Sequence, residues 1–191
     1  IEWNTPIGDT KSCGGDALIR VKAFLQVNGY RESLIAGEEP EMCYRLRQLG
    51  WKIMRLDAEM TLHDADMTRI GQWWKRHQRA GHAFAEAYPL HGRESESFRY
   101  QECRSILIWA LTIPLVILIF SWFYPIMLLA FMLYPVQIVR LALRYKKKYS
   151  TKISFFYAVS NVFSKWPQLI GLLSFWKNKL KGNKSTIIEY K

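Results

Sequence analysis

Three carboxylates stand close together in the stretch "GEEPEMCYRLRQLGWKI", which runs from Gly37 to Ile53. Glu38, Glu39 and Glu41 fall within four positions, immediately before a segment that can continue as a helix. Acidic side chains favour the first turn of a helix, where free N–H groups and the helix dipole attract negative charge. A general base that takes a proton from an attacking hydroxyl is also often a carboxylate, and a neighbouring carboxylate can raise its pKa. On these residues alone, a helix start and a catalytic cluster are both open.

A second group of side chains capable of binding lies in a helix that we predict from about Met67 to Tyr88. Arginine guanidinium groups match phosphate oxygens, and a tryptophan can stack on a sugar face or lie at a membrane interface. The predicted substrate-binding residues of this helix are Arg69, Trp73, Trp74, Arg76 and Arg79. The alternative is a basic amphipathic helix that rests on lipid headgroups.

The three cysteines, Cys13, Cys43 and Cys103, are odd in number and show neither CxxC spacing nor a close Cys/His cluster in the sequence. The sequence therefore predicts neither a disulfide framework nor a zinc site, and we expect reduced thiols.

A long apolar run follows the first half of the chain. Residues 106–139 are 34 positions without a formal charge. A single helix of that length would be about 50 Å long, whereas the hydrocarbon core of a bilayer is about 30 Å thick. Two spans joined by a turn at "SWFYP", residues 121–125, fit better. We therefore predict a transmembrane hairpin over residues 104–143.

The charges of the chain are distributed unevenly. Residues 1–102 carry 14 Lys/Arg against 15 Asp/Glu, whereas residues 103–191 carry 13 against one. A basic segment beside apolar runs fits an anionic membrane leaflet better than nucleic acid, and we expect no nucleic-acid partner. Basic residues flank both ends of the hairpin, which predicts that both ends lie on the cytoplasmic side. We interpret residues 144–191 as a basic amphipathic tail at the membrane interface, with a third, broken span as the alternative.

The first half, residues 1–100, has the pattern of a mixed soluble segment. Helical patterns cover "ALIRVKAFLQVNGY", which ends in the turn signal Asn28-Gly29, and "EPEMCYRLRQLG", which Gly50 closes. The runs "WKIMRLD" and "EMTLHD" resemble short strands. Helices alternating with strands predict an α/β layer, of which about 100 residues are only a part.

The ordered set of "CGGDALIR" (residues 13–20), "FLQVNGY" (24–30), "GEEPEMCYRLRQLGWKI" and "LHD" (62–64) resembles the carboxyl-terminal half of the catalytic domain of family 2 glycosyltransferases. The resemblance runs from about Gly14 to Ala85 and implies half of a GT-A, Rossmann-like α/β domain. The apolar hairpin is similar to that of the membrane-bound bacterial members, which often act on polysaccharides and lipid-linked sugars.

The resemblance implies roles for the acidic cluster. The family pattern is Glu-Asp-x-Asp-Leu, in which the first Asp is the general base. Glu38 takes the Glu position, Glu39 the base position and Glu41 the second Asp position. Since Glu is one methylene longer than Asp, either Glu38 or Glu39 could be the residue that reaches the acceptor.

Other residues also acquire expected roles from the resemblance. His63 corresponds to a histidine that helps to bind the divalent metal, Mg²⁺ or Mn²⁺, or contacts the diphosphate. Gly14 and Gly15 would allow a close approach of sugars to the backbone, and Asp16 would hydrogen-bond a sugar hydroxyl. Asp64-Ala65-Asp66 follows the acidic cluster, so we do not interpret it as the metal-binding Asp-x-Asp of the family, which precedes that cluster.

The sequence as a whole predicts part of a membrane-anchored, inverting glycosyltransferase of the plasma (inner) membrane, with its catalytic part in the cytoplasm. The expected partners are a nucleotide-sugar donor, a glycan or lipid-linked acceptor and the membrane. Because no donor-binding strands precede the resemblance, we expect this chain alone to be inactive. The alternative is a non-catalytic membrane anchor or scaffold that binds a partner enzyme.

Overall fold

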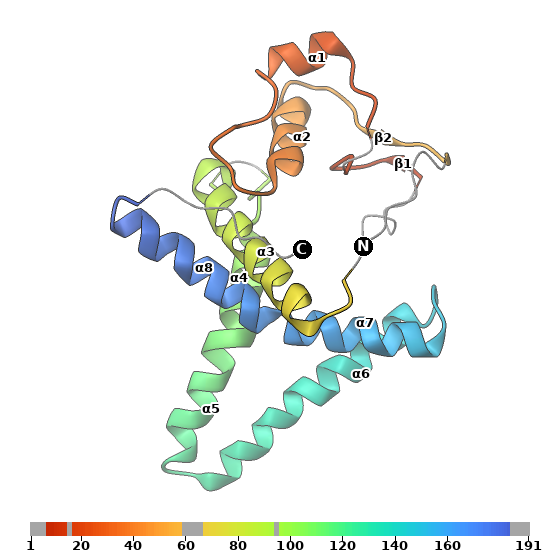
Figure 1. The fold of residues 1–191 in the computed structure, drawn as a ribbon. Helices are drawn as coiled ribbons and strands as arrows, with labels where there is room; N and C mark the ends of the chain where they lie inside the picture. Colours follow the sequence, from red (N-terminus) through yellow and green to blue (C-terminus); the bar gives the residue numbers. More distant parts are fainter. Residues whose placement is uncertain (1–6, 15–16, 59–66, 94–95, 184–191) are drawn as a thin grey trace.

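The computed structural model describes residues 7–14, 17–58, 67–93 and 96–183. It is mostly helical, with 67% helix against 2% strand. The predicted α/β fold class is therefore wrong, and no Rossmann-like sheet is present in the described part of the chain. Figure 1 shows a small region around α1 and α2 at one end of the molecule and a pair of long helices projecting from the other.

The sheet consists of two short strands, β1 (Gly8–Asp9) and β2 (Met54–Arg55). They pair antiparallel, with Gly8 opposite Arg55 and Asp9 opposite Met54. A parallel α/β layer needs several neighbouring strands, buried on both faces and covered by helices. Met54 is 62% exposed, so this pair of strands lies at the surface and cannot serve as the centre of such a layer. The second predicted strand, "EMTLHD", lies outside the described residues.

The two helices predicted in the first half are confirmed as α1 (Val21–Gln26) and α2 (Glu38–Gln48). Each ends where the sequence places a glycine turn: Gly29 has φ +63° and Gly50 has φ +81°, a backbone conformation that side chains with a Cβ disfavour. The helices share a small apolar core built from Ala23, Val27, Met42 and Leu46. This core fixes the orientation of α2 and thereby of its acidic first turn.

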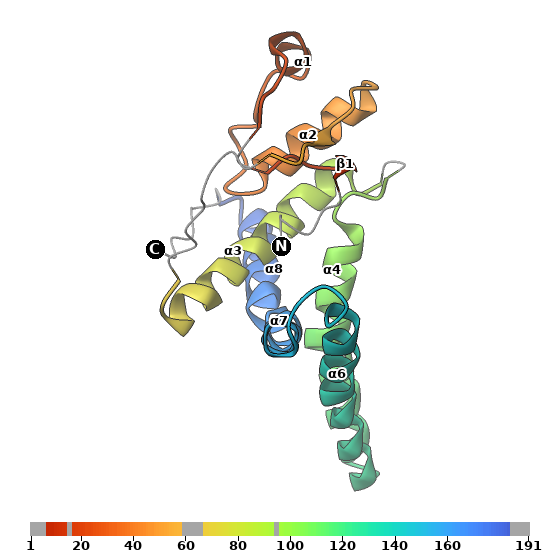
Figure 2. The same ribbon diagram turned by 90° about the vertical axis from the view of Figure 1, so that its right-hand side faces the viewer.

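The third predicted helix is confirmed as α3 (Ile70–His91), which crosses α8 (Lys165–Leu180) near the middle of the molecule. Two glycines permit the approach of these helices. A Cβ on Gly81 would overlap the carbonyl oxygen of Gln168, and a Cβ on Gly171 would overlap that of Gln78. Figures 1 and 2 show the crossing from two directions. The helix backbones therefore touch at this point, and larger side chains there would separate them.

The apolar hairpin begins with α4 (Tyr100–Leu107), the π-helical stretch η2 (Ile108–Thr112) and α5 (Ile113–Ser121). It returns through the 3-10 stretch η3 (Pro125–Met132) and α6 (Leu133–Tyr145). Two continuous helices, Tyr100–Ser121 and Pro125–Tyr145, are long and apolar enough to cross a membrane. Proline has no N–H to donate, and the helix widens into η2 just before Pro114. The predicted pair of helices with a turn near residues 121–125 is thus present.

Two further helices follow the hairpin, α7 (Thr151–Phe163) and α8, with the break at Ser164. One face of α8 is buried against α3 and α4, in a core that includes Ala85, Ile106, Leu169, Leu172 and Phe175. The tail thus packs on the first half of the chain. Phe155, Phe156 and Phe163 of α7 remain at least half exposed, which leaves an apolar surface on that helix.

Candidate functional site

A solvent-accessible cavity of about 440 Å³ lies at the amino-terminal end of α2. Three predicted site residues line it together: Gly14, Glu38 and Glu39. The rest of its wall comes from the loop between α1 and α2, through Tyr30, Arg31, Glu32 and Leu34. The acidic first turn of α2 is therefore a helix start, as the local pattern predicts, and also part of a cavity wall.

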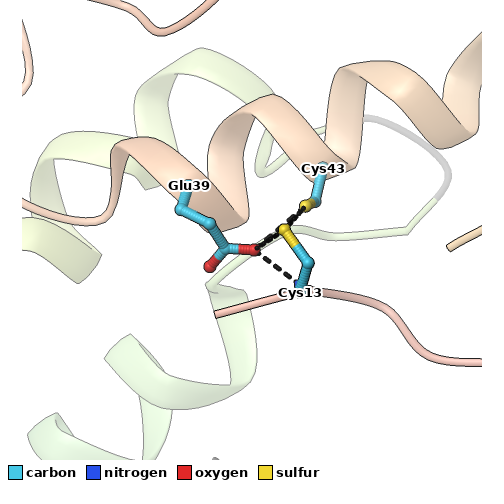
Figure 3. A group of neighbouring side chains, drawn as sticks. All are labelled: Cys13, Glu39 and Cys43. Carbon is cyan, nitrogen blue, oxygen red and sulfur yellow. Dashed lines mark hydrogen bonds between the residues drawn. The ribbon is translucent and has the colours of Figure 1, made fainter. Parts of the chain in front are cut away.

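One oxygen of Glu39 is held by three donors. Oε1 accepts hydrogen bonds from the backbone N–H of Cys13 at 2.7 Å, from the Cys13 thiol at 3.1 Å and from the Cys43 thiol at 3.0 Å. Figure 3 shows the second oxygen of Glu39 directed away from both cysteines. In the described part of the chain, that oxygen, Oε2, has no hydrogen-bond partner. The carboxylate is thus oriented by one oxygen while the other is available.

The two cysteines are neighbours although 30 positions separate them in the sequence. Their sulfur atoms lie 3.4 Å apart. The structure therefore contains a close cysteine cluster that the sequence spacing does not predict. The adjacent Cys13 thiol, burial and the Glu39 carboxylate together raise the pKa of the Cys43 thiol above its ordinary value, so this thiol donates at neutral pH.

Tyr30 places a phenol in the same cavity wall. Partial burial raises its pKa, and so does the electrostatic interaction with neighbouring groups, foremost Cys13 and Glu39. The hydroxyl therefore stays protonated at neutral pH and can donate a hydrogen bond to a molecule in the cavity. Tyr30 carries no signal of this role in the sequence, because only the fold brings the loop after α1 against the start of α2.

Glu41, two positions beyond Glu39, has a different environment. Its side chain is fully buried and pairs with three basic groups: Arg45 Nη2 at 2.8 Å, Arg31 Nε at 3.1 Å and His91 Nε2 at 2.9 Å. Arg45 also donates to the carbonyl oxygens of Val27 and Gly29. Glu41 is therefore the centre of a network that ties α2 to the turn after α1 and to the end of α3.

Burial alone would raise the pKa of Glu41, but hydrogen bonds from Arg45, His91 and Arg31 outweigh it and hold the pKa below its ordinary value. The carboxylate is ionised at neutral pH and does not line the cavity. The position that the family pattern assigns to a second acid is thus a structural ion-pair centre here.

Two of the five predicted binding residues in and just before α3 are used in packing. Trp73 Nε1 donates to Ser160 Oγ of α7 at 2.9 Å, and Arg79 donates to the carbonyl oxygen of Ile35 at 2.9 Å. Arg69, Trp74 and Arg76 are exposed, with Trp74 39% exposed. None of the five lines the cavity beside Glu39. Their proposed contacts with a diphosphate or a sugar stay predictions.

Ile35 is clamped by α3 at both of its backbone polar groups. Its carbonyl oxygen accepts from Arg79, and its N–H donates to Glu86 Oε2 at 3.3 Å. Arg79 and Glu86 are seven positions apart, so they lie on one face of the helix. The clamp fixes the loop that carries Leu34 into the cavity wall.

The remaining predicted site residues, Gly15, Asp16 and His63, lie outside the described residues. Among the residues that the structure describes, one group of His, Cys, Asp or Glu side chains offers three ligand atoms within reach of one ion: Cys13, Glu39 and Cys43. Its two sulfur donors do not fit Mg²⁺ or Mn²⁺, which prefer oxygen ligands. The divalent ion that the resemblance implies therefore has no matching site in this part of the chain.

Comparison with known proteins gives no relative for this chain. No protein-family model matches it, no curated protein matches it and no solved structure matches it. The resemblance to family 2 glycosyltransferases stays a prediction from motifs.

Proposed function

We propose that this chain belongs to a membrane-anchored enzyme that transfers a sugar from a nucleotide-sugar donor to a glycan or lipid-linked acceptor, with inversion. Glu39 is the general base that takes the proton of the attacking acceptor hydroxyl. The observation that carries the proposal is the position of Glu39 in a cavity wall, with Oε1 held by Cys13 and Cys43 and with Oε2 available.

The geometry at Glu39 meets the first requirement of a general base, which must reach the proton that it removes within hydrogen-bond distance. Three donors on Oε1 keep the side chain in one orientation, so Oε2 needs little reorganisation to accept a hydrogen bond from an acceptor hydroxyl. Tyr30 in the same wall can hydrogen-bond that acceptor. An in-line attack of the deprotonated hydroxyl on the anomeric carbon forms the new glycosidic bond and releases the nucleotide.

Glu38 is the competing candidate. It lines the same cavity, is exposed, and precedes Glu39 on the first turn of α2. The bonds from Cys13 and Cys43 orient Glu39, and for this reason we assign the base role to Glu39.

The proposal places the protein in the plasma (inner) membrane with residues 1–100 and the tail in the cytoplasm. In support, the two long apolar helices form a hairpin whose ends lie on the side of α3 and α8 (Figure 1). Trp122, Phe123 and Tyr124 at its tip are 86%, 70% and 64% exposed, as expected for aromatic residues at a membrane interface. No reaction step is assigned to Mg²⁺ or Mn²⁺, because the described residues do not form a suitable site.

Substitution of Glu39 by Gln tests the base role in the protein that contains this chain. The amide keeps the shape and can still accept the three hydrogen bonds on Oε1, but it cannot take a proton. We expect sugar transfer to slow by roughly two to four orders of magnitude with donor binding retained. The measurement combines initial rates of transfer with donor affinity from calorimetry.

Glu38→Gln is the matched control, since it removes an adjacent carboxylate from the same cavity wall. We expect a mild effect on transfer. A severe loss of transfer rate in Glu38→Gln with a mild loss in Glu39→Gln would identify Glu38 as the general base. Unchanged rates in both variants would overturn the catalytic proposal and favour a membrane anchor or scaffold.

Cysteine labelling in sealed vesicles tests the topology. In a background without native cysteines, cysteines introduced at Lys11 and Lys181 should react from the cytoplasmic face, and one at Trp122 from the opposite face. Opposite accessibility of the Lys11 and Lys181 positions would exclude the hairpin.

A further inference from the structure

Cys13, Glu39 and Cys43 form a compact set of potential metal ligands. The Cys13 and Cys43 sulfur atoms lie 3.4 Å apart, and each lies 3.0–3.1 Å from Glu39 Oε1. All three ligand atoms are on one side of α2, as Figure 3 shows. The cluster was unexpected from the sequence, where Cys13 is far from the other two.

The cluster is supported by two parts of the fold. Glu39 and Cys43 are four positions apart on α2 and therefore share a face of the helix. Cys13 approaches that face from the segment after β1, and its backbone N–H donates to Glu39 Oε1. Cys43 is fully buried, whereas Cys13 and Glu39 are partly exposed beside the cavity. Two separate segments thus bring the three ligand atoms together, and one of the three residues, Glu39, also lines the cavity.

The spacing of the ligand atoms is close to that of a tetrahedral zinc site. Zn–S bonds of about 2.3 Å and Zn–O bonds of about 2.1 Å place two sulfur ligands about 3.8 Å apart and a sulfur and an oxygen about 3.6 Å apart. The observed distances are shorter by roughly half an ångström. Small rotations of the three side chains would open the set enough to admit an ion.

The donor types select the class of metal. Two thiolates with one carboxylate are a soft set that favours Zn²⁺ and similar thiophilic ions over Mg²⁺, Mn²⁺ or Ca²⁺. The Cys13 N–H bond to Glu39 would remain as an outer contact that orients the ligating carboxylate.

We propose that Cys13, Cys43 and Glu39 bind one Zn²⁺ ion, with a water molecule from the cavity as the fourth ligand. Binding forms two Zn–S bonds and one Zn–O bond to the protein and releases the two thiol protons to solvent. The complex carries a net charge of −1, since two thiolates and one carboxylate surround a divalent ion. Affinity therefore rises with pH, because the ion competes with protons for both sulfurs.

Cobalt provides a direct probe of this site in the purified, reduced full chain in detergent. We expect Co²⁺ alone to bind with one ion per chain and to produce a thiolate-to-metal charge-transfer band and the strong visible bands of tetrahedral cobalt. Zn²⁺ should abolish both by displacement, with release of about two protons per ion when Zn²⁺ is added to the metal-free protein.

Three variants assign the ligands. Cys13→Ser and Cys43→Ser should each lose the tetrahedral spectrum, and Glu39→Gln should weaken Co²⁺ binding by about tenfold or more, a free-energy loss of at least about 1.4 kcal/mol. Cys103→Ser is the matched control, because Cys103 lies in α4, in the core beside α8. It should bind Co²⁺ as the native chain does.

A measurement on the native chain avoids dependence on variants that fail to fold. Bound Zn²⁺ should protect the partly exposed Cys13 from alkylation at elevated pH, whereas the buried Cys43 and Cys103 should react slowly with or without the ion. The absence of a charge-transfer band in the reduced native chain would overturn the proposal. So would a spectrum that persists in Cys13→Ser, or a Cys13–Cys43 disulfide that survives reduction. These readouts involve no sugar, so they are separate from the transfer test. Zn²⁺ on Glu39 would replace the two thiol donors and lower the basicity of the carboxylate, so the zinc-bound state and the general-base state belong to the metal-loaded and the metal-free chain.

Discussion

The region around α2 and the interface between α3 and α8 are stabilised in different ways. Around α2, a fully buried carboxylate, Glu41, pairs with Arg31, Arg45 and His91. Between α3 and α8, two glycines bring the backbones together around an apolar core. The first arrangement depends on charge and responds to pH. The second depends on close packing, so its stability is sensitive to an increase in side-chain volume. The cavity adjoins the charged region, since Arg31 pairs with Glu41 and also lines the cavity.

Removal of the central charge should have the largest effect on stability. Glu41→Ala leaves Arg45 and His91 without their shared carboxylate in a largely buried position. We expect a loss of about 3 kcal/mol in the free energy of unfolding, the lower end for a broken buried ion pair, since the partly exposed Arg31 regains water. Chemical unfolding in detergent, monitored by circular dichroism, measures this loss of stability. The exposed Glu38→Ala should change stability by about 0.5 kcal/mol or less, and equal losses in both variants would contradict the assigned role of Glu41.

Acid should weaken the same region reversibly and by less than the substitution. The pKa of Glu41 is lower in the folded chain than its ordinary value of 4.5, so the unfolded chain binds more protons as the pH falls. The contribution to stability is present above pH 4.5 and is lost as the pH falls through the folded pKa. Unfolding midpoints measured between neutral and acid pH should show this loss. In Glu41→Ala the corresponding part of the pH dependence should be absent.

A single methyl group should disturb the second region. The Cβ of Gly171→Ala would meet the backbone of Gln78 in α3, and we expect a loss of about 2 kcal/mol from overpacking. A Cβ at Gly71, which is also in a helix, would meet no atom within 4 Å, so Gly71→Ala should be neutral or stabilising by up to about 1 kcal/mol. Thermal unfolding of the two variants compares them directly. Equal stability would show that α3 and α8 are not in backbone contact.

The smallest expected effect concerns the contact between α3 and α7. Trp73→Phe keeps most of the ring and removes the donor to Ser160 Oγ. We expect a loss of about 1 kcal/mol. A double-mutant cycle with Ser160→Ala isolates the hydrogen bond from the change in packing, and additive losses would show that the two side chains do not interact.

Local patterns predicted the helices well, because their signals lie within one segment. The acidic first turn and Gly50 mark the two ends of α2, and the charge-free run 106–139 marks the two long apolar helices. The fold class was wrong because it depended on extending a short motif resemblance to a sheet that the described residues do not form. The motif set singled out Gly14, Glu38 and Glu39, and the structure places these three residues in the wall of one cavity.

The contacts that the sequence did not predict all join distant segments. Cys13 meets Cys43 across 30 positions and Glu41 meets His91 across 50. Neither pair has a spacing that a helix or a strand would explain. The four-residue spacing of Glu39 and Cys43 on α2 was the one local signal of the cluster. That spacing alone does not predict a cluster, because the third member, Cys13, comes from a distant segment.

The clamp on Ile35 has a consequence for how this chain can vary among related proteins. Arg79 and Glu86 hold the backbone of residue 35, not its side chain. Any residue with an N–H can therefore occupy position 35, whereas proline cannot. Evolutionary change should be tolerated in the loop and restricted at the two helix positions, so an arginine and a glutamate seven residues apart are the better marker in a search for homologues.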